Sequence, residues 1–151
     1  MTDASKKRGQ HMAAEIAESP AVFARAAGAD HATVLAGLNL GAMRSFYTIA
    51  RGSSDAAANT VSYELMRELG RPMTSLPPSI FSLGRGVDMA GSAALVISQS
   101  GASDDLVRSA RGVRGAGGVV LAITNQQGSA VESAAQATLA IAAGAELAVP
   151  A

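Results

Sequence analysis

The sequence predicts an α/β domain with a parallel sheet. Segments typical of strands alternate with segments of helical periodicity, the order expected when each helix connects two parallel strands. The strand candidates are apolar throughout, as in sheets that are covered on both faces. The chain of 151 residues is 48% hydrophobic but only 3% aromatic. We therefore expect a core of small aliphatic side chains, which lets helices lie close to the sheet.

The first 44 residues precede the first strand candidate. Residues 1–9 are expected to form a disordered tail, and residues 10–44 a set of helices, because apolar residues recur there at helical spacing. Pro20 follows the end of one helix or opens the next. The predicted helices cover residues 10–19, 20–27 and 31–43.

Five strand candidates follow, separated by four helices. Residues 93–98 (AALVIS) form a continuous apolar run, as expected for a strand buried on both faces. One side of the helix over 55–69 is apolar, and we expect this side to face the sheet. It consists of Val61, Leu65, Met66 and Leu69. The strands are predicted at residues 45–50, 72–76, 93–98, 118–123 and 137–142, and the helices at 55–69, 79–83, 103–115 and 129–135.

The composition argues against several classes of function. The formal net charge is zero, which predicts no basic face for nucleic acid. Without cysteine there is no disulfide framework, thiolate metal site or cysteine nucleophile. His11 and His31 are twenty residues apart in a helical region, so we expect two solvated side chains rather than a metal pair. Neither a metal nor a cofactor is expected.

The hydropathy pattern gives no sign of a membrane segment. No run of about 18 apolar residues is present, and the basic N-terminal residues are not followed by the apolar core of a signal peptide. The sequence therefore predicts a cytoplasmic protein without a membrane partner.

Three of the predicted strands end in polar residues. The ends read RGSSD from Arg51, SQSGAS from Ser98 and TNQ from Thr124. Open parallel sheets bind ligands at the carboxyl ends of their strands. A helix N-terminus there offers unpaired N–H groups, glycine lets the backbone approach closely, and hydroxyls donate to phosphate oxygens. The pattern predicts a small phosphorylated ligand that is held without a lysine.

A purely structural role for these serines is the alternative. Ser103 suits the N-cap of the helix that follows it, and Ser53 or Ser54 suits the cap of the helix over 55–69. Capping does not account for the SQSG cluster itself. Other motifs are absent: the chain has no Walker A loop, dinucleotide fingerprint or G-x-S-x-G elbow.

Over about residues 10–151 the chain resembles the sugar isomerase (SIS) domain. It is similar to the isomerase part of glutamine–fructose-6-phosphate aminotransferases, to glucosamine-6-phosphate deaminases and to phosphosugar isomerases. The similarity is carried by the segments ARGSSDAAANTVSYELMRELGRPM, LVISQSGASDDLVRSAR and VVLAITNQQGSAVESAAQATLAIAAGAELAVPA. The resemblance implies a three-layer αβα sandwich of the flavodoxin-like type, with a five-stranded parallel sheet and a phosphosugar at the strand ends.

The resemblance also implies which residues contact the sugar phosphate. Val149 matches a position whose backbone lies near the sugar, whereas Arg51 replaces the small or cysteine-like residue of some relatives. Glu146 lies in the family's Gly-x-Glu segment without an assigned role. The residues that match phosphate contacts are Ser98, Gln99, Ser100 and Ser103, together with Ser54. With the residues of the strand-end argument, the candidate substrate-binding set is Gly52, Ser53, Ser54, Ser98, Gln99, Ser100, Gly101, Ser103 and Val149.

Enzymes of this family usually carry two SIS domains, whereas this chain resembles one. The family's catalytic glutamate, histidine and lysine lie in the second domain or the C-terminal tail, so no catalytic residue is assigned here. We expect residues 45–151 to form a SIS domain that is truncated at its C-terminus, with no second SIS domain and no glutaminase module.

The expected function is phosphosugar binding, as the N-terminal half of an amino sugar phosphate deaminase or isomerase, or of an aminotransferase-type isomerase. The expected ligand is glucosamine 6-phosphate or fructose 6-phosphate. The alternative is a non-catalytic phosphosugar-sensing domain of a regulator. The family implies a homodimer, and apolar surface left uncovered after residue 151 would favour association. A Gly101→Val change is expected to abolish binding and leave the fold largely intact, because the backbone could no longer approach the phosphate.

Overall fold

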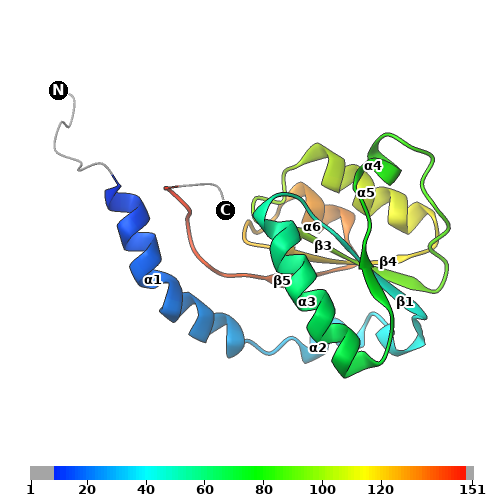
Figure 1. Ribbon diagram of the computed structural model, residues 1–151, viewed down its shortest axis with the longest axis horizontal. Coiled ribbons are helices and arrows are strands. Elements are labelled where there is room, and N and C mark those ends of the chain that lie inside the picture. The colour runs from blue at the N-terminus through cyan, green and yellow to red at the C-terminus, as the bar shows by residue number, and fades with distance from the viewer. Residues whose placement is uncertain (1–8, 149–151) are drawn as a thin grey trace. The chain divides into compact units, whose positions relative to one another are not determined.

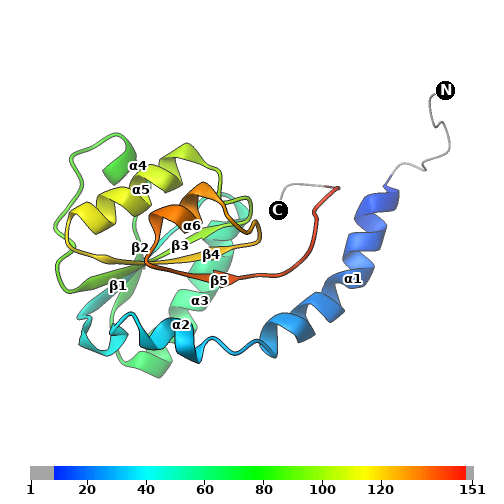
Figure 2. The ribbon, with the colours of Figure 1, turned by 180° about the vertical axis from the view of Figure 1, so that it is seen from behind.

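A computed structural model describes residues 9–148 of the chain. Residues 9–29 and 142–148 form one compact unit, and Asp30–Ile141 form a second, larger one. Figures 1 and 2 show the chain from opposite sides. The predicted tail over 1–9 lies almost entirely outside the described residues.

The larger unit contains a five-stranded parallel sheet, as predicted. The strands lie in the order β2-β1-β3-β4-β5, so the chain crosses from the edge strand β2 past β1 to reach β3. Each strand begins and ends within two residues of its predicted position. The strands are β1 (Ser45–Ile49), β2 (Met73–Ser75), β3 (Ser92–Ser98), β4 (Val119–Thr124) and β5 (Ala137–Ala140).

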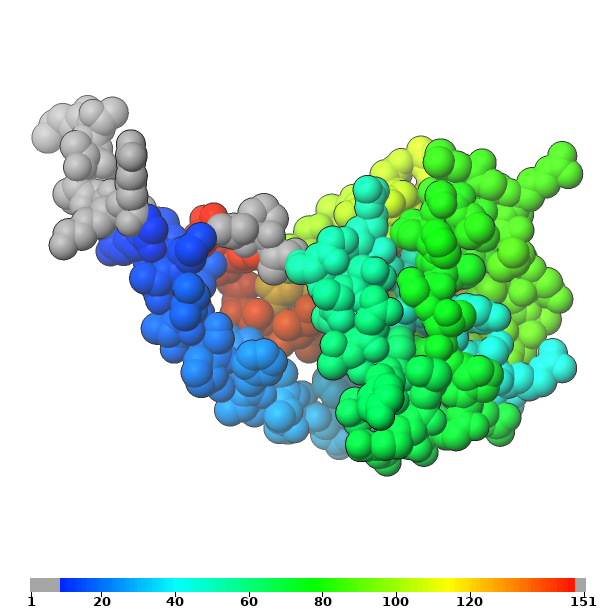
Figure 3. All heavy atoms as spheres, in the orientation of Figure 1, coloured from blue at the N-terminus to red at the C-terminus, as the bar shows by residue number. Residues whose placement is uncertain are grey.

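Helices cover both faces of this sheet, which gives the predicted three-layer α/β sandwich (Figures 1 and 2). One face carries α4 (Ser79–Ser82), α5 (Asp104–Gly115) and α6 (Ala130–Ala134). The other carries α2 (Ala32–Ala36), the 3-10 helix η1 (Leu40–Ala42) and α3 (Ser53–Leu69). The atoms of α3, coloured teal to green, form the outer surface of this unit in the space-filling view and hide much of the sheet (Figure 3).

The central strand β3 contributes to the core on both sides of the sheet. All of its residues are buried. Ala94 and Val96 pack in the cluster beneath α5 and α6. Ala93, Leu95 and Ile97 pack in the cluster beneath α3. Because successive side chains of a strand point to opposite faces, a continuous apolar run is what a sheet covered on both faces requires.

The prediction for the inner side of α3 is wrong in part. The buried residues of α3 are Ala58 and Ser62, and of the predicted residues only Leu65 packs against the core cluster. The other three are between 36% and 48% exposed: Val61, Met66 and Leu69. The small side chains of Ala58 and Ser62 let α3 approach the sheet closely, which leaves the larger apolar side chains at the rim.

The predicted division of the N-terminal helices is also wrong. Helix α1 (Gln10–Ala27) is continuous and contains Pro20 in its interior. Proline removes one backbone hydrogen bond, but the alanine-rich flanks have high helix propensity and continue the helix on both sides. The predicted helix over 31–43 is instead split into α2 and η1, because Asn39 adopts a left-handed conformation (φ +47°). No helix within residues 9–148 is long and apolar enough to cross a membrane.

Replacing Ile49 by alanine tests the core beneath α5. The Ile49 side chain is fully buried, so the truncation should lower the free energy of unfolding by about 2–5 kcal/mol. Leu83 is 86% exposed, so Leu83→Ala should change it by less than about 0.5 kcal/mol. Urea denaturation of both variants measures the difference. Equal losses would contradict the described core.

Candidate functional site

The polar ends of β1, β3 and β4 lie at one edge of the sheet. The parallel register pairs Ile49 with Val96 and Ser98 with Thr124. The turns that follow these neighbouring strands therefore leave the sheet side by side. This edge is where open α/β sheets bind their ligands.

The turn from β3 to α5 is fixed by hydrogen bonds to the neighbouring elements. The buried Ser98 Oγ accepts a hydrogen bond from the Gly101 N–H at 3.1 Å. The Gly101 carbonyl accepts one from the Val131 N–H of α6 at 2.9 Å, and the Gln99 carbonyl accepts one from the Asn125 N–H at 3.0 Å. Ser98 is thus a structural part of the turn, which is held to α6 and to the end of β4.

Gly101 is required at its position for two reasons. Its φ is +59°, which favours glycine, and a Cβ there would collide with the Cβ and Oγ of Ser129. The expectation that Gly101→Val leaves the fold largely intact is therefore not supported. A side chain at 101 would push the turn away from α6, so stability and binding would fall together.

The hydroxyls of Ser53, Ser54 and Ser103 make no hydrogen bond within residues 9–148. The N-cap of α3 is Gly52, which has no side chain to offer. Ser103 is the N-cap residue of α5, but its side chain makes no capping bond. Ser129, by contrast, caps α6 through its side chain. Capping therefore explains Ser129 but does not explain the three serines at the strand ends.

The other predicted residues of the two turns lie with these serines. Gly52 (φ +57°, ψ −134°) turns the chain from β1 into α3 in a conformation that favours glycine. Ser100 is exposed, and its Oγ accepts a long hydrogen bond of 3.4 Å from the Ala102 N–H. Gln99, between Ser98 and Ser100 in the turn after β3, is half-buried. The turns after β1 and β3 thus bring together every predicted site residue except Val149.

The sequence analysis names two further residues, Val149 and Glu146. Val149 is outside the described residues. Glu146 belongs to the smaller unit, where the N–H groups of its neighbours Leu147 and Ala148 donate to the Glu15 carboxylate at 2.7 and 3.1 Å.

The first turn of α5 carries a carboxylate that the sequence analysis did not single out. Asp105 accepts a hydrogen bond from Arg51 Nη1, the residue directly before Gly52, at 2.7 Å. The neighbouring Asp104 pairs with Arg108 at 2.7 Å. The acidic residues at the start of α5 are therefore each paired with an arginine. Arg51 stands at a predicted strand end and Asp105 in the first turn of the helix predicted over 103–115, but no sequence pattern links the two residues.

The arrangement suits a small anion. The N-terminus of α5 carries partial positive charge and N–H groups without intrahelical partners. The hydroxyls of Ser54 and Ser103 can each donate to an oxygen atom. Within residues 9–148 no group of three or more histidine, cysteine, aspartate or glutamate side chains is placed to hold a metal ion.

Comparison with known families identifies the family of this chain. The model of the SIS domain family matches residues 42–151. The chain belongs to the SIS domain family. No curated protein sequence matches the chain.

Solved structures of other SIS proteins superpose well on this chain. A protein from Silicibacter pomeroyi DSS-3, proposed to be a phosphosugar isomerase, is 35% identical with a TM-score of 0.83. The match covers 91% of this chain but only 43% of the Silicibacter chain. This SIS chain thus spans less than half the length of that relative.

Two more distant structures share the fold. The C-terminal domain of glucosamine-fructose-6-phosphate aminotransferase from Francisella tularensis is 24% identical, with a TM-score of 0.80, and the match covers 97% of this chain and 43% of that one. The Vibrio vulnificus NanR protein, complexed with ManNAc-6P, is 15% identical, with a TM-score of 0.71 and coverage of 87% and 51%.

A pair of glycine variants tests the packing of the turn. Gly101 and Gly128 both have positive φ, but only at Gly101 would a Cβ meet other atoms, those of Ser129 and Thr124. Gly101→Ala should lower the free energy of unfolding by about 2–4 kcal/mol, and Gly128→Ala by about 1–2 kcal/mol. Guanidinium denaturation measures both. If the two variants lose the same stability, the close contact with Ser129 is not the constraint.

Proposed function

We propose that this SIS chain binds a sugar phosphate at the edge formed by the turns after β1 and β3. The observation that carries the proposal is the set of hydroxyls on Ser53, Ser54 and Ser103, which make no hydrogen bond within residues 9–148. Exposed or half-buried hydroxyls at the start of a helix are donors available for an anion. The phosphate would lie before α5, with Ser100 and Gln99 beside it.

The substrate class that we propose is a phosphorylated amino sugar or ketose, glucosamine 6-phosphate or fructose 6-phosphate. The aminotransferase domain from Francisella supports it, as does the isomerase assignment of the Silicibacter protein. In this proposal the predicted contact from Val149 completes the sugar site.

The reaction that we propose for the whole protein is isomerisation, deamination or amination of that sugar phosphate. Aldose–ketose isomerisation moves a proton between adjacent carbons of the opened sugar and needs a general acid and base. In the proposal this chain holds the phosphate and so positions the reacting carbons, without itself supplying the acid or the base. The cytoplasmic location remains a prediction from the sequence.

A phosphosugar sensor is the second candidate function. The NanR structure with ManNAc-6P supports it, because its fold is shared with this chain and its ligand is a sugar phosphate. The two candidate functions share the same binding site and differ in whether the bound sugar phosphate is converted to a product. A protein that binds but never converts either sugar phosphate, with ammonia present or absent, would favour the sensor.

Titration calorimetry with glucosamine 6-phosphate and fructose 6-phosphate tests binding, with inorganic phosphate as the reference. Wild-type protein should bind at least one sugar phosphate more tightly than phosphate. Ser103→Ala should weaken that binding by about tenfold or more, because it removes a donor to a charged group. The same variant should keep its stability within about 0.5 kcal/mol, since the hydroxyl makes no capping bond.

Thr60→Ala is the matched control for this titration. Its hydroxyl donates to the Ala56 carbonyl on the exposed side of α3, so the variant should bind like wild type. If Ser103→Ala lowers stability and leaves affinity unchanged, the serines serve as caps and the proposed function is wrong.

We also propose that the chain forms a homodimer through one side of α1. Helical spacing places a set of exposed, uncharged residues along one side over the length of this helix, and a second copy of α1 is the partner that fits it. Antiparallel pairing would set Ile16 against Phe23, with small residues between them to allow close approach. The charged residues Glu18 and Arg25 lie on another side of α1, where they pair at 3.4 Å. The uncharged side consists of Met12, Ala13, Ile16, Ala17, Pro20, Phe23, Ala24 and Ala27.

A charge on this side of α1 should oppose the dimer. Phe23 is 75% exposed, and Phe23→Glu would bury a carboxylate at the interface, raising the dimer dissociation constant by about tenfold or more. Ala21→Glu adds the same charge on the opposite side of α1 and should have little effect. Sedimentation velocity over a concentration series measures both. A wild-type chain that stays monomeric, or equal effects of the two variants, would refute this interface.

A further inference from the structure

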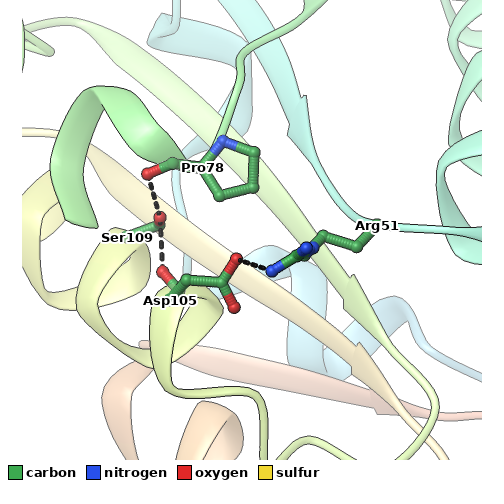
Figure 4. A network of polar contacts seen from close by, with 4 residues as sticks. All are labelled: Arg51, Pro78, Asp105 and Ser109. Carbon is green, nitrogen blue, oxygen red and sulfur yellow. Dashed lines mark hydrogen bonds and ion pairs between the residues drawn. The ribbon is translucent and has the colours of Figure 1, made fainter. Parts of the chain in front are cut away.

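Arg51 links the two turns of the candidate site. It stands at the carboxyl end of β1, and its Nη1 donates to Asp105 Oδ2 of α5 at 2.7 Å. The two residues are 54 positions apart in the sequence. Figure 4 shows the Arg51 side chain crossing from the end of β1 to the first turn of α5. The pair therefore spans from the turn after β1 to the turn after β3.

Asp105, the partner of Arg51, lies in a helical turn that is held by hydrogen bonds and by core packing. The Asp105 carbonyl accepts a hydrogen bond of 2.7 Å from Ser109 Oγ, which also donates to the Pro78 carbonyl at 3.1 Å (Figure 4). Ser109 is fully buried, and Leu106 beside Asp105 is 2% exposed. The first turn of α5 is thus held by its own core contacts and by the segment before α4.

The turn that Arg51 precedes has fewer restraints. Gly52 adopts a conformation that favours glycine, and a Cβ there would meet nothing within 4 Å. The hydroxyls of Ser53 and Ser54 make no hydrogen bond within residues 9–148. Ser75 Oγ donates to Asp55 at 3.4 Å and ties the start of α3 to β2, whereas the contact from Arg51 to Asp105 links this turn to α5.

The charges around Arg51 argue against a direct role in attracting the anion. A hollow of about 300 Å³ opens beside the pair. Its charged lining residues, two arginines and two aspartates, cancel in formal charge. The hollow is lined by Arg51, Ser82, Leu83, Asp104, Asp105 and Arg108. An unpaired Asp105 carboxylate would repel a phosphate bound beside it. The electrostatic effect that we assign to Arg51 is therefore to neutralise this carboxylate.

We infer that Arg51 is a positioning residue for the sugar-phosphate site. Acting through Asp105, it holds the turn that carries Ser53 and Ser54 at a fixed distance from the turn that carries Ser103, and it neutralises the carboxylate nearest the anion. The inference rests on the proposed function for its ligand.

A double-mutant cycle on binding tests this role. Arg51→Ala should weaken glucosamine 6-phosphate or fructose 6-phosphate binding about fivefold, the size expected for a partly exposed ion pair. In an Asp105→Asn background the same change should alter affinity less than about twofold, because Arg51 then has no carboxylate to act through. A fivefold loss that persists in that background would overturn the inference and make Arg51 a direct ligand contact.

Hydrogen exchange in the ligand-free protein gives a second, independent test. Arg51→Ala should speed exchange of the Asp55 amide about threefold or more, because this N–H donates to the Gly52 carbonyl at 3.1 Å and the turn loses its link to α5. Arg67→Ala is the matched control, because it breaks an equally short ion pair with Glu64 (2.8 Å) on the exposed side of α3. Unchanged exchange in Arg51→Ala would overturn the inference. Wild-type protein that binds neither sugar phosphate would count against the proposed function, and the exchange result would still decide the role of Arg51.

Discussion

The close approach of the β3–α5 turn to the start of α6 is the contact on which the site depends. Gly101 lies against the Ser129 side chain, with no room for a Cβ between them. Its carbonyl is taken by Val131 and its N–H by Ser98. Because the inward polar groups of the turn are used in this way, its outward side is left with the Ser100 and Ser103 hydroxyls and the first N–H groups of α5. The close packing of Gly101 against Ser129 therefore determines which polar groups of the turn hold it in place and which remain available to a ligand.

Electrostatics explains how a chain of zero net charge can present an anion site. Asp104 and Asp105 stabilise the N-terminus of α5 through the helix dipole, but unpaired they would repel a phosphate. Arg108 and Arg51 pair with them at 2.7 Å each. The helix start then keeps its oriented N–H groups while the nearby formal charges cancel. Binding would come from short-range hydrogen bonds, which are less sensitive to salt than a cluster of lysines.

Much of the fold could be predicted from the sequence because β3 and β4 are apolar on both faces and their ends change abruptly to small polar residues. Periodicity failed where side-chain size decides packing: Ala58 and Ser62 face the sheet, and the larger Val61 and Met66 lie at the rim. It failed again at Pro20, where flanking helix propensity outweighs one lost hydrogen bond. These outcomes depend on how closely neighbours approach, which no local pattern records.

For the site, the sequence predicted which residues gather at the sheet edge but not the contacts that each of them makes. The grouping of serines at strand ends follows from parallel topology, which brings those ends to one edge. At α3 the outcome depends on a shift of one residue, because the helix begins at Ser53 and Gly52 takes the N-cap position. At α5 Ser103 does take the N-cap position, but its side chain makes no capping bond. The link from Arg51 to Asp105 joins residues 54 positions apart, and only the folded chain brings them together.

A site made of backbone N–H groups and hydroxyls offers hydrogen-bond donors to a phosphate, and none of the proposed contacts is assigned as a general acid or base. Such a site suits an isomerase, a deaminase or a sensor equally well, because each must first hold the same phosphate. The fold itself is shared with an aminotransferase domain and with the NanR protein. What would separate these functions is the group that reaches the sugar carbons. In the proposal, changes in the turns after β1 and β3 alter affinity whichever function holds, and in an enzyme they also disturb the position of the reacting carbons.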